Sequence, residues 1–89
     1  MRTFFCSSFS KDLSRIENPD ILDQLRVFIN LIDTIDNLRS ISGIRKMKGS
    51  KTAYRIRLGE YRIGIHKLND GIEFTRILHR KDIYKYFPK

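Results

Sequence analysis

Residues 52–68 have the sequence TAYRIRLGEYRIGIHKL and decide the fold, because their apolar residues recur at every second position. In the first half, Tyr54, Ile56 and Leu58 alternate with two arginines. The pair Gly59-Glu60 makes a tight reversal, after which three more apolar residues alternate in the same way. A period of two is typical of a strand with one buried face. The stretch therefore predicts a β-hairpin whose two faces differ in chemistry.

Alternation places Arg55 and Arg57 on the face opposite the apolar residues, and Arg62 joins them from the second strand of the hairpin. We call the surface formed by these three residues the arginine face. A solvated sheet face is the alternative interpretation, but solvated faces usually mix charges of both signs. Arginine makes planar, multidentate contacts to phosphate and does not deprotonate, so a phosphate-binding surface is expected. Further basic residues flank it in the sequence: Lys48, Lys51, Arg80 and Lys81.

Two helices are expected before the hairpin. Phe9, Leu13 and Ile16 recur at helical spacing, and Ser8 can cap the start of this short helix. The triplet Asn18-Pro19-Asp20 then opens a longer helix, since asparagine is a good N-cap and proline suits the first helical position. Its apolar stripe, expected to pack on a sheet, consists of Ile21, Leu25, Phe28, Ile32 and Ile35, widened by Leu22, Ile29 and Leu38.

The remaining segments complete the order β-α-α-β-β-β with a short tail. Residues 2–6 predict a first strand, 39–51 a polar and basic connection, and 72–78 a last strand. Ile77 breaks the alternation of that last strand, which leaves a bulge and a sheet covered on both faces as alternatives. Residues 79–88 are expected to form a turn or a short helix. The order predicts a two-layer α+β fold, with a mainly antiparallel sheet and both N-terminal helices on one face.

Length and composition favour a soluble protein with a polyanionic partner. The 89 residues suit a single domain, 1–89, and a hydrophobic content of 40% is enough for one core. The net charge is +8, and it is uneven: residues 1–41 hold five Lys/Arg and six Asp/Glu, whereas 42–89 hold thirteen and four. The C-terminal part is therefore expected to face nucleic acid or a nucleoprotein. Without a signal peptide or a long apolar run, a cytoplasmic location with no membrane partner is expected.

The sequence offers few groups for catalysis beyond the arginines. Cleavage of RNA needs an activated 2′-hydroxyl, a stabilised phosphorane and a protonated leaving oxygen. His79 is a candidate for the proton transfers and Tyr84 for orienting the substrate or moving a proton, while packing roles remain the alternative for both. His66 is interpreted as a surface residue, and Cys6 as a buried apolar residue of the first strand. Since there is no P-loop, dinucleotide motif, nucleophile elbow or carboxylate cluster, no metal or cofactor is expected.

Several segments, in order, resemble the RelE/ParE superfamily of toxins. The resemblance rests on Met47-Lys48-Gly49, on residues 54–63 with the sequence YRIRLGEYRI, and on residues 77–84 with the sequence ILHRKDIY. It implies a RelE-like fold and the toxin half of a type II toxin–antitoxin pair, with an acidic antitoxin as partner. RelE-like members act on the ribosome and cut mRNA without a metal, through attack of the 2′-hydroxyl. ParE-like members share the fold and inhibit DNA gyrase, which is the alternative function.

The resemblance also implies roles for individual residues. Arg55 and Arg57 match a paired basic motif of the family, and Arg62 matches its phosphate-stabilising arginine. The family's basic residue after the last strand corresponds to Arg80 or Lys81. The C-terminal tyrosine corresponds to Tyr84, with Tyr86 as the alternative, and His79 departs from RelE itself, which leaves the general base open. Three lysines, Lys46, Lys48 and Lys51, are candidates for contact with the ribosome.

Overall fold

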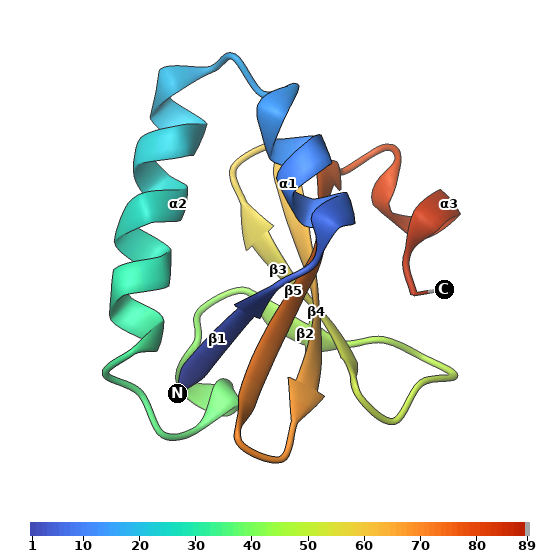
Figure 1. Cartoon of the computed structure of the whole chain (residues 1–89). Helices are drawn as coiled ribbons and strands as arrows, with labels where there is room; N and C mark the ends of the chain where they lie inside the picture. Colours follow the sequence, from blue (N-terminus) through green and yellow to red (C-terminus); the bar gives the residue numbers. More distant parts are fainter. Residues whose placement is uncertain (89) are drawn as a thin grey trace.

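A computed structural model describes residues 1–88 and shows one five-stranded sheet with helices on both of its faces (Figure 1). The strand order is β1-β5-β4-β3-β2. Strand β1 pairs with β5 in parallel, and every other neighbouring pair is antiparallel. The predicted α+β architecture with a mainly antiparallel sheet is therefore confirmed. The strands are β1 (Arg2–Phe5), β2 (Ile44–Lys46), β3 (Ala53–Leu58), β4 (Tyr61–Leu68) and β5 (Gly71–His79).

Helices α1 (Ser7–Ser14) and α2 (Pro19–Ile32) cover one face of the sheet, as expected (Figure 1). The side chain of Asn18 accepts a hydrogen bond from the Asp20 amide at 2.9 Å, so the predicted N-cap of α2 is confirmed. The predicted cap of α1 is wrong. Ser8 lies inside the helix, and its hydroxyl donates instead to the Thr75 carbonyl at 2.6 Å.

The main core lies between these helices and the sheet. Helix α2 ends at Ile32, but its apolar stripe continues into a 3-10 turn, η1 (Leu38–Ser40), so that the connection also covers the sheet. No helix in residues 1–88 has both the length and the apolar character needed to cross a membrane. The fully buried core side chains from both layers are Phe9, Ile32, Ile56, Ile63, Ile65, Ile72, Phe74 and Ile77.

Strand β2 was not expected, because the sequence predicted only a connection over residues 39–51. It has three residues and pairs with β3, so that Arg45 lies opposite Arg55. A strand this short shows no usable alternation in the sequence. Cys6 also differs from expectation: it follows β1 as the residue before α1 and is half-buried. Partial burial, with Glu73 nearby, raises the pKa of its thiol.

Strand β5 contains a bulge, which explains the broken alternation of its apolar residues. Ile65 pairs with Phe74, and the preceding Gly64 pairs with Arg76, so that Thr75 has no partner on β4. Before the bulge Phe74 faces the helices, and after it Ile77 does. Arg76 and Leu78 consequently point to the opposite face, where Leu78 packs on a second cluster. Both alternatives that the sequence left open therefore hold together.

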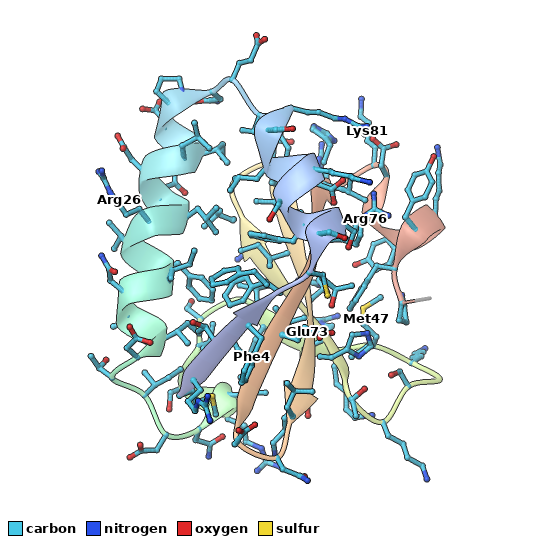
Figure 2. The ribbon with its side chains drawn as sticks, in the orientation of Figure 1. Phe4, Arg26, Met47, Glu73, Arg76 and Lys81 are labelled. Atoms are coloured by element: carbon cyan, nitrogen blue, oxygen red, sulfur yellow. The ribbon has the colours of Figure 1, made fainter. Side chains whose placement is uncertain are left out.

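The second cluster lies beneath the C-terminal helix α3 (Ile83–Tyr86), which confirms the short helix expected in the tail. Its buried members are Met47, Ala53, Ile83 and Phe87. Figure 2 shows Met47 and Arg76 on this side of the sheet, opposite Arg26 on α2. The Phe87 ring covers Gly64, where an added Cβ atom would lie only 2.7 Å from the ring. The sheet is thus covered on its second face as well, but only by this small helix.

Helix α1 covers the part of β5 that β1 leaves unpaired. Strand β1 reaches only to Phe74, so the outer edge of β5 is open beyond that residue. The carboxylate of Asp12 accepts a hydrogen bond there from the Ile77 amide at 3.1 Å, and two more from the Arg76 guanidinium at 2.7 and 3.0 Å. Covering an edge with a helix prevents it from pairing with another chain. The side chain of Asp12 is only 2% exposed, so these donors take the place of water around the carboxylate.

Asp12→Ala is expected to lower the free energy of unfolding by about 3 kcal/mol, since it leaves a buried amide and a buried guanidinium without their acceptor. Urea denaturation measures this effect. The matched control is Asp23→Ala, which removes an aspartate paired with Arg26 on the surface of α2, where its side chain is 67% exposed. That change is expected to cost less than about 0.5 kcal/mol. Equal losses in the two variants would contradict the role given to Asp12.

Candidate functional site

The three residues of the arginine face lie together, as the alternation predicts. Arg57 and Arg62 are directly opposite each other across β3 and β4, and Arg55 lies two residues along β3 on the same face. The pKa of Arg62 is lowered, first because partial burial removes its guanidinium from water and then because Arg55 and Arg57 are positively charged. An anion bound here would relieve this repulsion. The arrangement therefore suits phosphate.

Arg62 is held in place by the turn between β3 and β4. Its Nη1 donates to the carbonyls of Gly59 and Tyr61, each at 2.9 Å. Gly59 has a positive φ of 59°, a conformation that glycine adopts without steric cost. The turn thus orients the Arg62 side chain beside Arg57.

Arg55 connects the arginine face to the C-terminal helix. Its Nε donates to the phenol oxygen of Tyr84 at 3.1 Å, and its Nη1 donates to the Gly43 carbonyl at 3.3 Å. Because the phenol oxygen is the acceptor in this bond, the phenol hydrogen is free to be donated to another group. Tyr84 is 60% exposed, so a ligand can reach it. A basic group and a proton-bearing group therefore lie side by side at the surface.

Three contacts fix α3, and with it Tyr84. The first is the packing of Phe87 on Gly64. The second is a cation–π contact, in which the Arg76 guanidinium lies 5.4 Å from the centre of the Tyr86 ring. The third is the pair of hydrogen bonds by which Asp12 holds Arg76. Tyr86 is therefore occupied in anchoring the helix, and Tyr84 is the tyrosine beside the arginine face.

His79 lies away from the arginine face. It is opposite Tyr61 across β4 and β5, on the side of the helices, and the two rings meet edge to face with centres 5.8 Å apart. Its Nδ1 accepts a hydrogen bond from the Lys81 amide at 3.2 Å, and its Nε2 lies 3.9 Å from a carboxylate oxygen of Glu60. The sequence placed His79 at the edge of the arginine face, but the bulge in β5 reverses the side to which it points.

His66 and Arg80 are nearer the site, although both are engaged by other groups. The Nδ1 atom of His66 lies 2.9 Å from the Thr52 hydroxyl, and its ring packs against Phe87 with centres 5.3 Å apart. Arg80 pairs with Glu60 at 2.9 Å and is close enough to Arg62 to contribute to its lowered pKa.

The predicted lysines differ in how close they lie to the arginine face. Lys48 lies beside Arg55 and Tyr84, where they line a hollow of about 360 Å³. Lys51 and Lys81 are exposed in the segments that follow β2 and β5. Lys46 is opposite Tyr54 in the β2–β3 pair, which directs its side chain toward the helix-covered face, and it also lines the hollow beside Lys48 because β2 is the edge strand.

Arg45 is a basic residue near the site that the sequence did not single out. It is opposite Arg55 in the β2–β3 pair, and it lines the same hollow as Tyr84. Its position depends on β2, and no sequence signal revealed that strand. Within residues 1–88, no group of three or more His, Cys, Asp or Glu side chains is arranged to hold a metal ion.

The chain is similar over its whole length to the toxin RelE3 of Methanocaldococcus jannaschii, with 40% identity over 89 residues, which cover 99% of this chain and 100% of that protein. In structure it is similar to a chain of the RelB-RelE antitoxin-toxin complex from Methanococcus jannaschii, with a TM-score of 0.81, 40% identity, and coverage of 96% of this chain and 99% of that one. No protein-family model matches the chain.

Two more distant structures share the fold alone. The YoeB dimer from Staphylococcus aureus has a TM-score of 0.72 at 15% identity, covering 90% of this chain and 97% of the other. The E. coli DinJ-YafQ complex has a TM-score of 0.67 at 15% identity, covering 93% and 97%.

Gly64→Ala is expected to displace Phe87 and loosen α3, at a cost of about 1–3 kcal/mol in the free energy of unfolding. The reason is the 2.7 Å approach of the added Cβ atom to the ring. A double-mutant cycle with Phe87→Ala, followed by urea denaturation, measures the coupling between the two positions. The smaller side chain leaves room for the alanine, so the double variant should lose less than the two single losses combined. Simple additivity would contradict the packing described for Gly64.

Proposed function

The chain belongs to the RelE family of toxins, and from that premise we propose that it is an endoribonuclease that cleaves mRNA on the ribosome. The observation that carries this proposal is the arginine face together with Tyr84, whose phenol accepts a hydrogen bond from Arg55 at 3.1 Å. These groups suit metal-independent cleavage, because they can neutralise a phosphate and move a proton at the same place.

In the proposed reaction, the 2′-hydroxyl of one nucleotide attacks the adjacent phosphate. The attack forms a pentavalent phosphorane, and the 5′-oxygen of the next nucleotide leaves with a proton. Arg57 and Arg62, opposite each other on β3 and β4, bind the non-bridging oxygens and stabilise the charge that develops on them. Arginine remains protonated at neutral pH, so it supplies charge and not proton transfer.

Tyr84 is proposed as the general acid that donates its proton to the leaving 5′-oxygen, because Arg55 holds its oxygen and leaves its hydrogen free. The proton of the attacking 2′-hydroxyl passes to water, and water later returns a proton to Tyr84. His79, the other candidate, lies against Tyr61 on the opposite face of the sheet. We assign it a structural role at the end of β5. Arg80 and Lys81 are proposed to extend the positive surface for the RNA, and Lys46, Lys48 and Lys51 to contact the ribosome.

A cognate antitoxin is the proposed protein partner, and the related M. jannaschii toxin has been solved in complex with RelB. An acidic antitoxin suits a chain with a net charge of +8. We propose that residues 1–89 act as one domain in the cytoplasm, where ribosomes and mRNA are found, without a metal, another cofactor or a membrane partner. Inhibition of DNA gyrase, the ParE-like function, ranks second because the relative with 40% identity is a RelE toxin. A supercoiling assay distinguishes the two functions.

Arg62→Ala is expected to lower the rate of mRNA cleavage by about 10²–10³-fold, because it removes a charged donor aimed at the phosphorane. Mapping of mRNA ends after incubation with programmed ribosomes gives this rate. The control is Arg26→Ala, which removes the same charge from the exposed surface of α2, on the other side of the sheet, and should leave the rate unchanged. Cleavage at the wild-type rate by the Arg62 variant would disprove the proposal, as would a wild-type protein that cuts no mRNA.

Tyr84→Phe is expected to lower the cleavage rate at saturating ribosome concentration by roughly 10²-fold, since the ring remains and only the phenol is lost. His79→Gln is expected to change that rate by less than about threefold, because the glutamine amide still offers an acceptor to the Lys81 amide. The same mapping assay compares the two variants. A larger loss of cleavage rate in the His79 variant than in the Tyr84 variant would indicate that His79 transfers the proton.

A further inference from the structure

Helix α3 is a single turn of four residues, Ile83–Tyr86, so the sheet beneath it determines its orientation. Even much longer isolated helices are only marginally stable in water. Tyr84, the residue of α3 with a proposed chemical role, lies within this turn. The position of its phenol therefore depends on the contacts that dock the helix.

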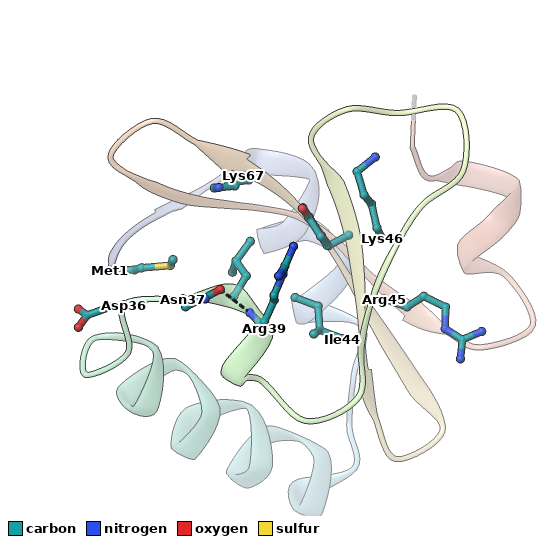
Figure 3. Close-up of a pocket in the computed structure, with 10 residues that line it drawn as sticks. Met1, Asp36, Asn37, Arg39, Ile44, Arg45, Lys46 and Lys67 are labelled. Atoms are coloured by element: carbon teal, nitrogen blue, oxygen red, sulfur yellow. Dashed lines mark hydrogen bonds between the residues drawn. The ribbon is translucent and has the colours of Figure 1, made fainter.

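The sheet beneath α3 presents one row of residues across four strands. Arg55 on β3 is opposite Gly64 on β4, and Gly64 is opposite Arg76 on β5. The row continues to Arg45 on β2, which is opposite Arg55 and in Figure 3 extends away from the pocket drawn there, toward the C-terminal segment. Gly64 is the one member of this row without a side chain. Phe87 packs there, with an arginine on each side of it.

The two tyrosines of α3 reach the arginines on either side of Gly64. Successive residues of a helix are about 100° apart around its axis, so Tyr84 and Tyr86 project to opposite sides of the buried Ile83. On one side, the Tyr84 oxygen accepts a hydrogen bond from Arg55 at 3.1 Å. On the other side, the centre of the Tyr86 ring is 5.4 Å from the Arg76 guanidinium. A rotation of the helix about its axis would therefore disturb both contacts.

Of these two arginines, Arg76 is held the more firmly. Its Nε and Nη2 donate to the two carboxylate oxygens of Asp12, at 2.7 and 3.0 Å. A bidentate pair fixes the plane of the guanidinium as well as its position. The side chain of Asp12 is buried and that of Arg76 is only 23% exposed, so little water competes for these bonds. Arg76 is thus the fixed point against which α3 is oriented.

Direct contact with RNA is the alternative role for Arg76, because it is on the same face of the sheet as the arginine face. Its surroundings favour orientation of the helix. Within residues 1–88, the ion pairs involve none of Arg55, Arg57 and Arg62, whereas the charge of Arg76 is matched by Asp12. A guanidinium that already has a carboxylate gains less from a phosphate than one that has none.

We propose that Asp12 and Arg76 are positioning residues for the cleavage reaction. Through Tyr86 they orient α3, and so they place the Tyr84 phenol beside Arg55, where it can donate its proton to the leaving oxygen. In this arrangement neither Asp12 nor Arg76 touches the RNA. The inference rests on the proposed function, since it needs Tyr84 as the general acid. It makes the rate of the chemical step depend on a carboxylate of the first helix.

The test replaces the charged pair by a neutral one, in the variant Asp12→Asn/Arg76→Gln. The asparagine oxygen still accepts from the Ile77 amide, and the two side-chain amides can bond to each other, so the fold is retained while the cation beside Tyr86 is lost. We expect the cleavage rate at saturating ribosome concentration to fall about three- to tenfold, because a misplaced proton donor slows the chemical step. The half-saturating ribosome concentration should not change.

Variants of Tyr86 test the same path from its other end. Tyr86→Leu removes the ring and is expected to lower the saturating rate as much as the neutral pair does. Tyr86→Phe retains a ring for the Arg76 guanidinium and is expected to restore the wild-type rate. An equal loss in the phenylalanine and leucine variants would overturn the proposal, because it would assign the role to the Tyr86 hydroxyl.

The matched control is Arg2→Gln/Asp70→Asn, at the other end of β5. Arg2 likewise pairs with a carboxylate, that of Asp70 at 3.1 Å, and its guanidinium is 5.2 Å from the centre of the Phe4 ring. The control removes one charge of each sign, as the test variant does. Both kinetic constants should stay at their wild-type values. Thermal unfolding of every variant establishes that it is folded.

Combination with Tyr84→Phe separates positioning of the phenol from a general loosening of the fold. If Asp12 and Arg76 act through the phenol, the neutral pair should lower the rate by less than about twofold once the phenol is gone. Two losses that multiply would overturn the proposal. An unchanged saturating rate would overturn it too, as would a raised half-saturating concentration, which would make Arg76 an RNA ligand.

A second measurement needs no cleavage. Nuclear Overhauser contacts between the Tyr84 ring and the Arg55 side chain report whether the phenol is in place in the free protein. We expect them in the wild type and in the control, and we expect the neutral pair to lose them. If it loses them in a protein that cuts no mRNA, the proposed activity is refuted and this inference stands. If the neutral pair keeps them, the inference fails and the proposed activity is unaffected.

Discussion

The carboxylate of Asp12 is the contact on which the second face of the molecule depends. It closes the edge of β5 by accepting from the Ile77 amide, and it holds the Arg76 guanidinium in the position where Tyr86 packs on it. A buried carboxylate is stable only with such donors, and a strand edge is protected only when its amides are satisfied. One side chain from the first helix thus connects the N-terminal layer to the C-terminal tail, which are separated by most of the chain.

The two faces of the sheet are stabilised unequally, and the difference suits their roles. One face has the main core, which gives the fold its stability. The other has a small cluster beneath α3, and Phe87 approaches the sheet closely only because Gly64 has no side chain. The rest of that face is free for Arg55, Arg57 and Arg62, whose mutual repulsion is a cost that a bound phosphate removes. The residues that stabilise the fold are therefore mostly different from those that are proposed to bind phosphate.

The sequence predicted those parts of the structure that repeat locally. The period of two in residues 52–68 gave the hairpin and the shared face of its arginines, and the Asn18-Pro19 cap gave the start of α2. It missed β2, which is three residues long, and with it Arg45 beside Arg55. The sequence also did not predict long-range contacts. Serine is a common helix cap, but the Ser8 hydroxyl donates a hydrogen bond to the Thr75 carbonyl on β5. The placement of His79 failed because the broken alternation at Ile77 indicated either a bulge or a sheet covered on both faces, and the sequence did not decide between them.

That bulge has a consequence for how residue roles are transferred between related toxins. Thr75 is an extra residue in β5 with no partner on β4, and it shifts the phase of every side chain that follows it. Two relatives can have identical residues at the end of this strand. If one of them lacks the extra residue, the same side chains point to opposite faces of the sheet. A sequence alignment matches residue types and does not record the face of the sheet to which each side chain points. A catalytic role for a residue after the bulge can therefore be transferred only between chains that share the bulge.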